Sequence, residues 1–209
     1  MATSTIDTDT ELSAVNSILG SIGQSPSTAT TLDFTNPEIS YIYNILTEVN
    51  KDVQNEGWHF NTEYHVKTSP DANKNIPIPS KTLRYSIHDG LGKKTRDFAV
   101  RGSMGSQILY DLVNHTDEFE EDFDLDIVTL YPFDDLPPIF KRYITYRAAV
   151  RAATQLVSNP QLVKLLQQDE AKTRAACMEY ECDMGNHSFM GFPHESSYQS
   201  YQPYKALRR

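Results

Sequence analysis

The sequence has few of the residues that define several broad classes of protein. Its 209 residues include two cysteines, Cys177 and Cys182, which are too few for a disulfide scaffold and favour a reducing compartment. No stretch approaches the roughly 20 apolar residues of a membrane span. The first residues lack the basic and then apolar pattern of a signal peptide. We therefore expect neither membrane insertion nor a secreted, disulfide-stapled fold.

Basic residues are also scarce, with 19 Lys and Arg against 28 Asp and Glu and a net charge of −9. Because phosphate contacts need positive surface, this balance argues against a general nucleic-acid-binding protein. Tyrosine, in contrast, is the commonest aromatic residue, with 12 copies against 9 Phe and 1 Trp. Since tyrosine buries a ring while keeping a polar tip, this excess indicates surfaces that are buried against other molecules.

The first 57 residues predict two helices. Thr8 and Glu11 have the spacing of a capping box, and Asn36-Pro37 is a typical helix start. Gly57 is expected to end the second helix. Apolar residues recur at steps of three and four in both segments, which predicts one buried stripe on each helix. The stripes are Leu12, Val15, Leu19 and Ile22 in the first helix, and Ile39, Ile42, Leu46, Val49 and Val53 in the second.

Two more helices are predicted in the C-terminal half of the chain. Asp134 and Asp135 are expected to cap the third helix, and Asn159-Pro160 starts a fourth that runs to about Met184. The stripe of the third helix contains Ile139, Tyr143, Tyr146, Val150, Ala153 and Val157. The stripe of the fourth helix is thin, so a second face of that helix is free to meet a neighbouring molecule.

Between these helical pairs the apolar period changes to two, which is typical of strands with one buried face. Residues 58–67 alternate in this way, and Asp89-Gly90 is a hairpin turn signal. Shorter strands are expected at 83–87, 98–101, 107–112 and 126–131.

These patterns predict an α+β fold. The two N-terminal and two C-terminal helices, in residues 1–57 and 132–187, are expected to form an antiparallel helical bundle, because both pairs have short connections. Residues 58–131 are expected to form an inserted antiparallel β lobe. Residues 188–209 are expected to form an extended C-terminal tail.

Motifs for metal binding are incomplete. Asp122, Asp124 and Asp126 have the spacing that begins a calcium loop, but Ile127 stands where glycine is required. Two cysteines and two histidines are candidate zinc ligands. The side chains of residues five apart on a helix, however, point about 140° apart, so the two cysteines cannot bind one metal ion together. That set is Cys177, Cys182, His187 and His194.

Signatures of an enzyme are also missing. His59 and His65 are expected on the polar face of one strand with Glu63, which is an arrangement for acid–base chemistry, but no nucleophile motif accompanies them. The glycine-rich run at 101–106 lacks the lysine of a phosphate loop. We therefore expect no catalytic residue, no metal and no cofactor.

Acidic residues are concentrated in one segment. Nine of them, and no Lys or Arg, lie between Asp117 and Asp135. A solubilising outer surface is one interpretation. The other is a wall that repels a polyanion, with Asp122, Asp124 and Asp126 on one face of a strand, and it requires several subunits around a channel.

The C-terminal tail combines aromatic and basic residues without any apolar period. The tyrosines are suited to anchor the tail on a partner, and the basic residues to meet carboxylates there. These six residues are Tyr198, Tyr201, Tyr204, Lys205, Arg208 and Arg209.

Several short motifs follow one another in order along roughly residues 10–185. They are Glu11–Asn16 with Ile18-Leu19 and Ser21–Gly23, then Gly57-Trp58-x-Phe60-Asn61, then Cys177–Glu181, together with the charge pattern around Gln168, Glu170 and Arg174. In this order and spacing the chain resembles the tail tubular protein A family, the head-to-tail adaptors or gatekeepers of short-tailed, podovirus-type bacteriophages.

The resemblance implies a structural virion protein and no enzyme. Twelve copies would form a ring between the portal protein and the tail nozzle, tail tubular protein B, with tail fibres as a further candidate partner. Double-stranded DNA would pass through the ring without specific binding during ejection into the host. The three aspartates would line an acidic channel, and the six tail residues would contact the portal or a neighbouring subunit. The expected location is the tail of the virion, after synthesis in the cytoplasm of the bacterial host.

Two other functions remain open at this point. A glycan hydrolase acting on host surface polysaccharide needs two carboxylates about 5–10 Å apart, and the chain is rich in carboxylates. A free-standing binding module is the third class. The native mass separates the adaptor, which forms a ring, from an active monomeric hydrolase.

Overall fold

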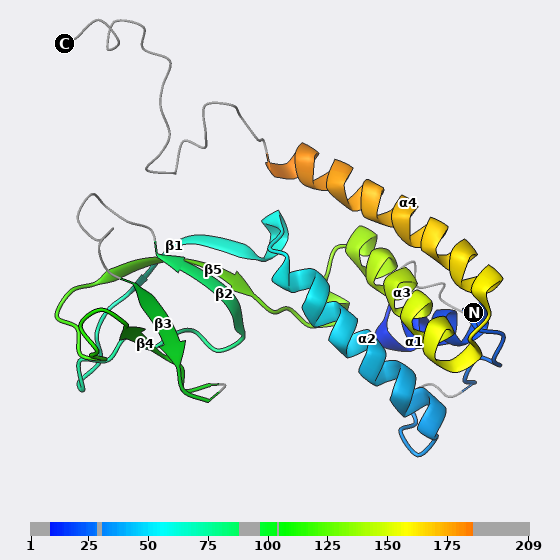
Figure 1. Cartoon of the computed structure of the whole chain (residues 1–209), viewed down its shortest axis with the longest axis horizontal. Coiled ribbons are helices and arrows are strands. Elements are labelled where there is room, and N and C mark those ends of the chain that lie inside the picture. The colour runs from blue at the N-terminus through cyan, green and yellow to red at the C-terminus, as the bar shows by residue number, and fades with distance from the viewer. Residues whose placement is uncertain (1–8, 29–30, 88–96, 104, 186–209) are drawn as a thin grey trace, which may run out of the picture. The chain divides into compact units, whose positions relative to one another are not determined.

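A computed structural model describes residues 9–28, 31–87, 97–103 and 105–185. Within them lie four α-helices and five strands that pair antiparallel, so the predicted α+β class is confirmed. The chain divides into two compact units, one of helices and one of strands. The helical unit contains the residues before Gly57 and Leu130–Glu181, and the β unit contains Gly57–Thr129. Both units are drawn in Figure 1.

The first helix, α1, spans Glu11–Ser21, and its N-cap differs from the predicted one. Thr10 accepts a hydrogen bond from the Ser13 N–H at 3.3 Å, and the Ser13 hydroxyl accepts one from the Thr10 N–H at 3.1 Å. The predicted cap at Thr8 is therefore wrong. Ser13 supplies the reciprocal acceptor that a Glu supplies in the usual capping box, so the box begins two residues later.

The second helix, α2, spans Pro37–Asn55 and begins as predicted. The Asn36 side chain accepts a hydrogen bond from the Glu38 N–H at 3.0 Å, and Pro37 occupies the first helical position. Gly57 follows the last turn with φ of +79°, a left-handed conformation that ends helices and that glycine adopts without strain.

The third helix, α3, spans Pro138–Ala152 and has no side-chain cap. Asp134 and Asp135, the predicted capping residues, lie instead in a 3₁₀ turn at Phe133–Asp135, too early to reach the helix start that Pro137 and Pro138 impose. The Asp134 carboxylate accepts a hydrogen bond from the Glu11 N–H at 3.1 Å, so it serves the N-terminus of α1.

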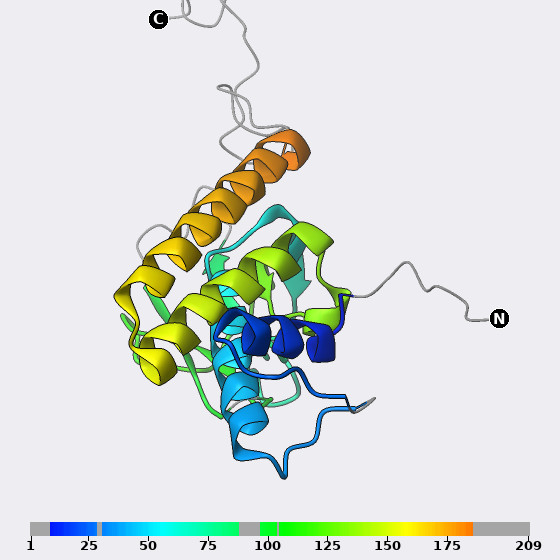
Figure 2. The same ribbon diagram turned by 90° about the vertical axis from the view of Figure 1, so that its right-hand side faces the viewer.

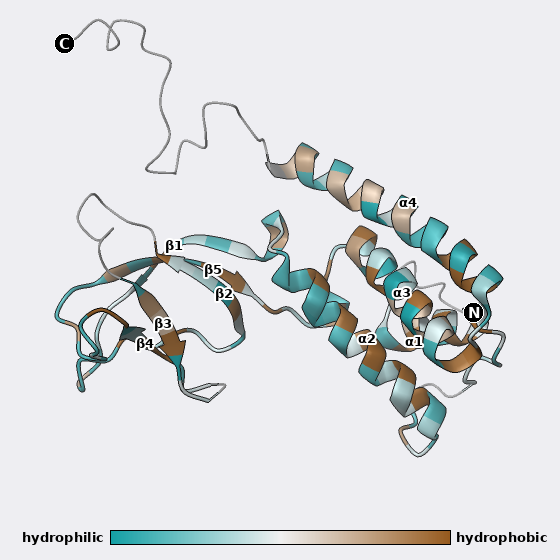
Figure 3. Cartoon of the chain, in the orientation of Figure 1, coloured by the Kyte–Doolittle hydropathy of each residue, from teal (hydrophilic) through white to brown (hydrophobic). Residues whose placement is uncertain are grey.

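A π turn at Ala153–Val157 and the left-handed Ser158 connect α3 to the fourth helix, α4, which spans Pro160–Gly185 in agreement with the prediction. In Figure 2, α4 runs alongside α3. Two side chains of α4 are buried, Leu166 and Cys177, and Figure 3 shows that much of its surface is hydrophilic. Burial raises the pKa of Cys177 to about 11. The predicted thin stripe is confirmed.

The core of the helical unit forms where α1 and α2 pack against α3. The predicted stripes of α1 and α2 lie in it: Val15, Leu19, Ile22, Ile39, Ile42, Leu46, Val49 and Val53 are buried, whereas Leu12 is half-buried. The predicted stripe of α3 is partly wrong, because Val157 is exposed and Ile139, Tyr146 and Val150 are only half-buried. The buried face follows a step of four instead. It contains Phe140, Ile144, Ala148 and Ala152, with Tyr143 beside them.

The β unit contains two small antiparallel sheets. The larger has the strand order β1-β5-β2, formed by Thr62–Thr68, Phe123–Thr129 and Thr82–Ile87. The smaller pairs β3, Phe98–Arg101, with β4, Ile108–Asp111. Their shared core consists of Ile76, Ile78, Leu109, Phe119, Phe123, Leu125 and Ile127. Asp89-Gly90, the predicted hairpin turn, lies outside the described residues.

Two strands begin three or more residues away from the predicted start. β1 begins at Thr62 and not at Trp58, because His59–Asn61 form a 3₁₀ turn in which the Asn61 side chain accepts a hydrogen bond from the Trp58 N–H at 2.8 Å. β5 begins three residues before the predicted start at Asp126. In neither unit does a described helix have the length and apolar character needed to cross a membrane.

Candidate interaction surfaces

The acidic strand β5 has the predicted alternation. Phe123, Leu125 and Ile127 are buried, while Asp124 and Asp126 lie half-buried on the opposite face. The side chain of Asp122, just before the strand, is exposed. The structure therefore shows the face that the sequence predicted, with the carboxylates partly covered.

His65 explains this partial cover. It lies in a bulge of β1 with φ of +56°, a left-handed conformation that is strained for a histidine. Its backbone N–H donates to Asp126 Oδ1 at 3.0 Å, and its ring Nδ1 lies 2.9 Å from Asp124 Oδ2. Two of the three predicted channel residues thus hold the bulge of the neighbouring strand. In the predicted acid–base set, His65 lies beside Asp124, and His59 belongs to the 3₁₀ turn before β1 and not to the strand.

The acidic segment is divided between the units. Seven of its nine acidic residues lie in the β unit, whereas Asp134 and Asp135 lie in the helical unit. Just before β5, Phe119 is buried between exposed Glu118 and Glu120, and its ring packs on Phe98 and Phe123 with centroid distances of 6.2 and 5.2 Å. The two glutamates therefore project from a fixed backbone.

A network of charged residues connects three helices of the helical unit, and no sequence pattern indicated it. The Glu56 carboxylate, after the last turn of α2, forms ion pairs with two guanidinium groups. Its oxygens lie 3.0 Å from a guanidinium nitrogen of Arg147 in α3 and 3.1 Å from one of Arg174 in α4. Both guanidinium groups also donate to the Tyr143 hydroxyl, at 3.1 and 2.7 Å. Hydrogen bonds from Arg174 to Glu56 and Tyr143 raise the pKa of Arg174. Burial alone would lower the pKa of Arg147, but Tyr143 and Glu56 raise it.

Replacement of Glu56 by glutamine tests this network. We expect Glu56→Gln to lower the free energy of unfolding by about 1–3 kcal/mol, because the half-buried guanidinium group of Arg147 and the exposed one of Arg174 lose their shared charged acceptor. Chemical denaturation measures this change. The matched control is Glu48→Gln, which removes an exposed carboxylate 3.4 Å from Arg151 and should cost at most about 1 kcal/mol. Equal losses for both variants would contradict a special role of Glu56.

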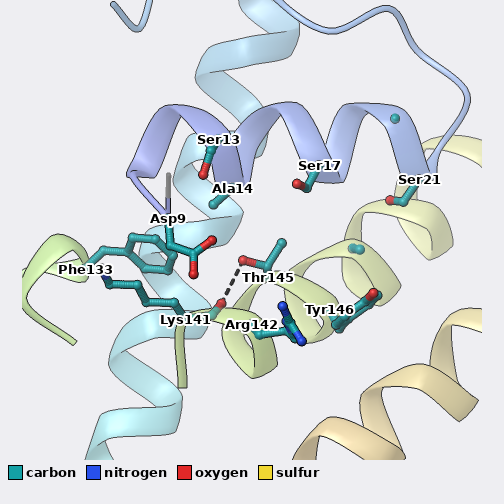
Figure 4. Close-up of a pocket in the computed structure, with 12 residues that line it drawn as sticks. Asp9, Ser13, Ala14, Ser17, Ser21, Phe133, Lys141, Arg142, Thr145 and Tyr146 are labelled. Carbon is teal, nitrogen blue, oxygen red and sulfur yellow. Dashed lines mark hydrogen bonds between the residues drawn. The ribbon is translucent and has the colours of Figure 1, made fainter. Parts of the chain in front are cut away.

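A polar groove lies between α1 and α3 with a volume of about 460 Å³. Ser13, Ser17 and Ser21 of α1 face Arg142, Thr145 and Tyr146 of α3 across it, as Figure 4 shows. Lys141 also lines the groove, although its side chain is only 5% exposed. A second hollow between α3 and α4 shares Asp9 and Arg142 with the groove. Sequence reasoning missed Lys141, because a buried lysine is rare on an otherwise apolar helix face.

Other predicted sites are only partly placed by the structure. Tyr198, Tyr201, Tyr204, Lys205, Arg208 and Arg209 lie outside the described residues, as do His187 and His194. Cys177 is buried and Cys182 exposed, as expected for residues on different sides of α4. Over the described ranges no group of three or more His, Cys, Asp or Glu is placed so that it could hold a metal ion.

Two comparisons with known proteins bear on these surfaces. A family model described as tail tubular protein matches residues 12–187, which is well over half of the chain. No curated protein matches the sequence.

Proposed function

The chain belongs to the tail tubular protein family, a structural component of the bacteriophage tail, and on this basis we propose that it is the head-to-tail adaptor of a short-tailed phage. In this function the protein forms a ring of twelve copies that joins the portal to the tail nozzle, and DNA leaves the capsid through the ring. The observation that carries the proposal is the family match, which includes all four helices from Leu12 onward and the whole β unit.

The helical unit supports a role in assembly. We propose that its four helices form an antiparallel bundle, with the β lobe inserted at 58–131 and the tail at 188–209 as separate parts. α4 buries few side chains, and it presents exposed apolar residues, among them Leu165 at 60% and Met178 at 47% exposure. Such residues are suited to an interface, and a ring requires two different contact surfaces on every subunit.

The partners follow from this function. They are neighbouring copies of the chain, the portal protein, the nozzle protein and, as a further candidate, tail fibres, with assembly in the host cytoplasm and a final place in the virion tail. The six aromatic and basic tail residues would contact the portal or a neighbouring subunit. No observation favours the glycan hydrolase, and two carboxylates of the acidic segment, Asp124 and Asp126, are engaged by His65.

The acidic face of the β unit is proposed to line the channel. We expect the triple replacement of Asp122, Asp124 and Asp126 by asparagine to slow DNA passage. Removing three negative charges per subunit weakens the electrostatic repulsion between the channel wall and the DNA phosphates. Asparagine retains an oxygen that can accept from the His65 N–H, so the fold should lose at most about 2 kcal/mol. DNA-ejection rates from assembled particles measure the effect. Ejection at the unaltered rate would assign these residues to an outer surface.

The mass of the native assembly tests the function. The purified chain, alone and mixed with portal protein, is expected to give a ring of about twelve subunits by native mass spectrometry and a central hole in electron micrographs. A chain that stays monomeric under both conditions, and does not bind portal rings, would contradict the adaptor.

A further inference from the structure

The groove between α1 and α3 carries two basic side chains, Lys141 and Arg142, that are suited to an acidic peptide. The ammonium group of Lys141 belongs to a side chain that is 95% covered, and within the described part of the chain no ion pair or hydrogen bond of this group is found. The neighbouring Arg142 is exposed and has no described ion-pair partner. Two cationic groups without a described counter-charge make the groove suited to a ligand that brings negative charge.

The walls of the groove favour a carboxylate ligand. The exposed Ser17 hydroxyl and the Arg142 guanidinium lie on opposite walls, as Figure 4 shows, and both can donate to an oxygen between them. Asp9 is the acidic residue among those that line the groove. With Lys141 and Arg142, the lining therefore carries a positive balance in a chain whose net charge is −9.

A matching acidic segment exists on the β unit of the same chain. Glu118 and Glu120 are exposed on either side of buried Phe119, whose N–H donates to the Lys74 carbonyl oxygen at 2.8 Å. The Glu120 carboxylate also pairs with the Lys74 ammonium at 3.0 Å, so Glu118 is the main acidic group that this segment offers to a partner. The backbone of this segment is thus held by a hydrogen bond and by aromatic packing. A segment that is already ordered loses little conformational entropy when it binds.

From these observations we propose that the groove of one copy receives the Glu118–Glu120 segment of the neighbouring copy. This inference rests on the proposed ring and names its subunit contact. Acidic subunits repel one another unless opposite charges meet at their interface. Lys141 and Arg142 on the helical unit, and Glu118 and Glu120 on the β unit, provide the two different surfaces that a closed ring needs.

Charge reversal on each side tests the contact. We expect Arg142→Glu and Glu118→Arg each to weaken self-association of the full-length chain by about tenfold or more, measured by sedimentation velocity over a range of concentrations. Combining the two reversals restores an opposite-charge pair, so the double variant should regain association to within about threefold of the parent chain. Both positions are exposed, and unchanged thermal melting will verify that the variants fold.

The matched control is Lys164→Glu on α4, an exposed basic residue outside the groove, which should leave association unchanged. Rings formed equally well by Arg142→Glu would overturn the proposed contact while leaving the adaptor function intact. Failure of the double variant to recover, after both single variants lose association, would equally overturn it and assign the groove to another acidic partner. A parent chain that never forms rings, even with portal protein, would contradict the adaptor itself.

Discussion

Truncation of Leu46 to alanine is expected to lower the free energy of unfolding by about 2–5 kcal/mol. Leu46 lies on α2 with 2% of its side chain exposed, in the core that α1, α2 and α3 share. Removal of three carbons there loses transfer free energy and leaves a cavity that packed helices fill only in part. Urea or guanidinium denaturation of the purified chain, with an unchanged m-value, measures the loss.

The control for this truncation is Leu165→Ala. Leu165 has the same chemistry but is 60% exposed on α4, so its removal should change stability by at most about 0.5 kcal/mol. If Leu46→Ala costs no more than Leu165→Ala, the shared core of α1, α2 and α3 is not the main source of stability in the helical unit. Leu19→Ala on α1, where the side chain is 3% exposed, should behave as Leu46→Ala does.

Deletion of residues 196–209 is expected to abolish attachment to the portal. This segment contains Tyr198, Tyr201 and Tyr204 with the basic residues that follow them, and aromatic residues of this kind carry much of the binding free energy in protein interfaces. The deletion should leave the free energy of unfolding within about 0.5 kcal/mol, since the described core residues of both units all precede this segment. Binding to immobilised portal rings measures the first effect and denaturation the second.

A second variant separates the aromatic from the basic residues of the tail. Replacement of Lys205, Arg208 and Arg209 by alanine should slow association and reduce its dependence on salt, because charges at the edge of an interface mainly steer the encounter. A truncated chain that docks on portals with unchanged affinity would remove the tail from the interface.

The sequence predicts best those elements whose signals are local. α2 begins at Asn36-Pro37 and buries the predicted stripe, because a cap, a proline and a regular period coincide within one segment. The stripe of α3 is only partly correct, because this helix packs against both α1 and α2, and tertiary contacts decide which of its apolar positions are covered. Small alanines at 148 and 152 carry little periodic signal in the sequence, yet they are buried.

Features that depend on distant residues are not predictable from one sequence. Glu56 lies 91 positions before Arg147 and 118 before Arg174, and only folding brings both guanidinium groups to its carboxylate and to the Tyr143 hydroxyl. The β bulge at His65 breaks a regular alternation, because Asp124 and Asp126 on the adjacent strand hold it. In both cases the sequence indicates charged surface and the structure shows an internal contact.

The helical unit is assembled from two stretches of chain that the β unit separates, and this has a consequence for synthesis. Roughly 80 residues lie between the end of α2 at Asn55 and the start of α3 at Pro138. Because synthesis adds about 5–20 residues per second, the apolar faces of α1 and α2 remain without α3 for about 4–16 s while the ribosome makes the residues in between. During that interval Val15, Leu46 and Val53 have no α3 to cover them. The nascent chain is therefore expected to be a client of holding chaperones until α3 leaves the exit tunnel.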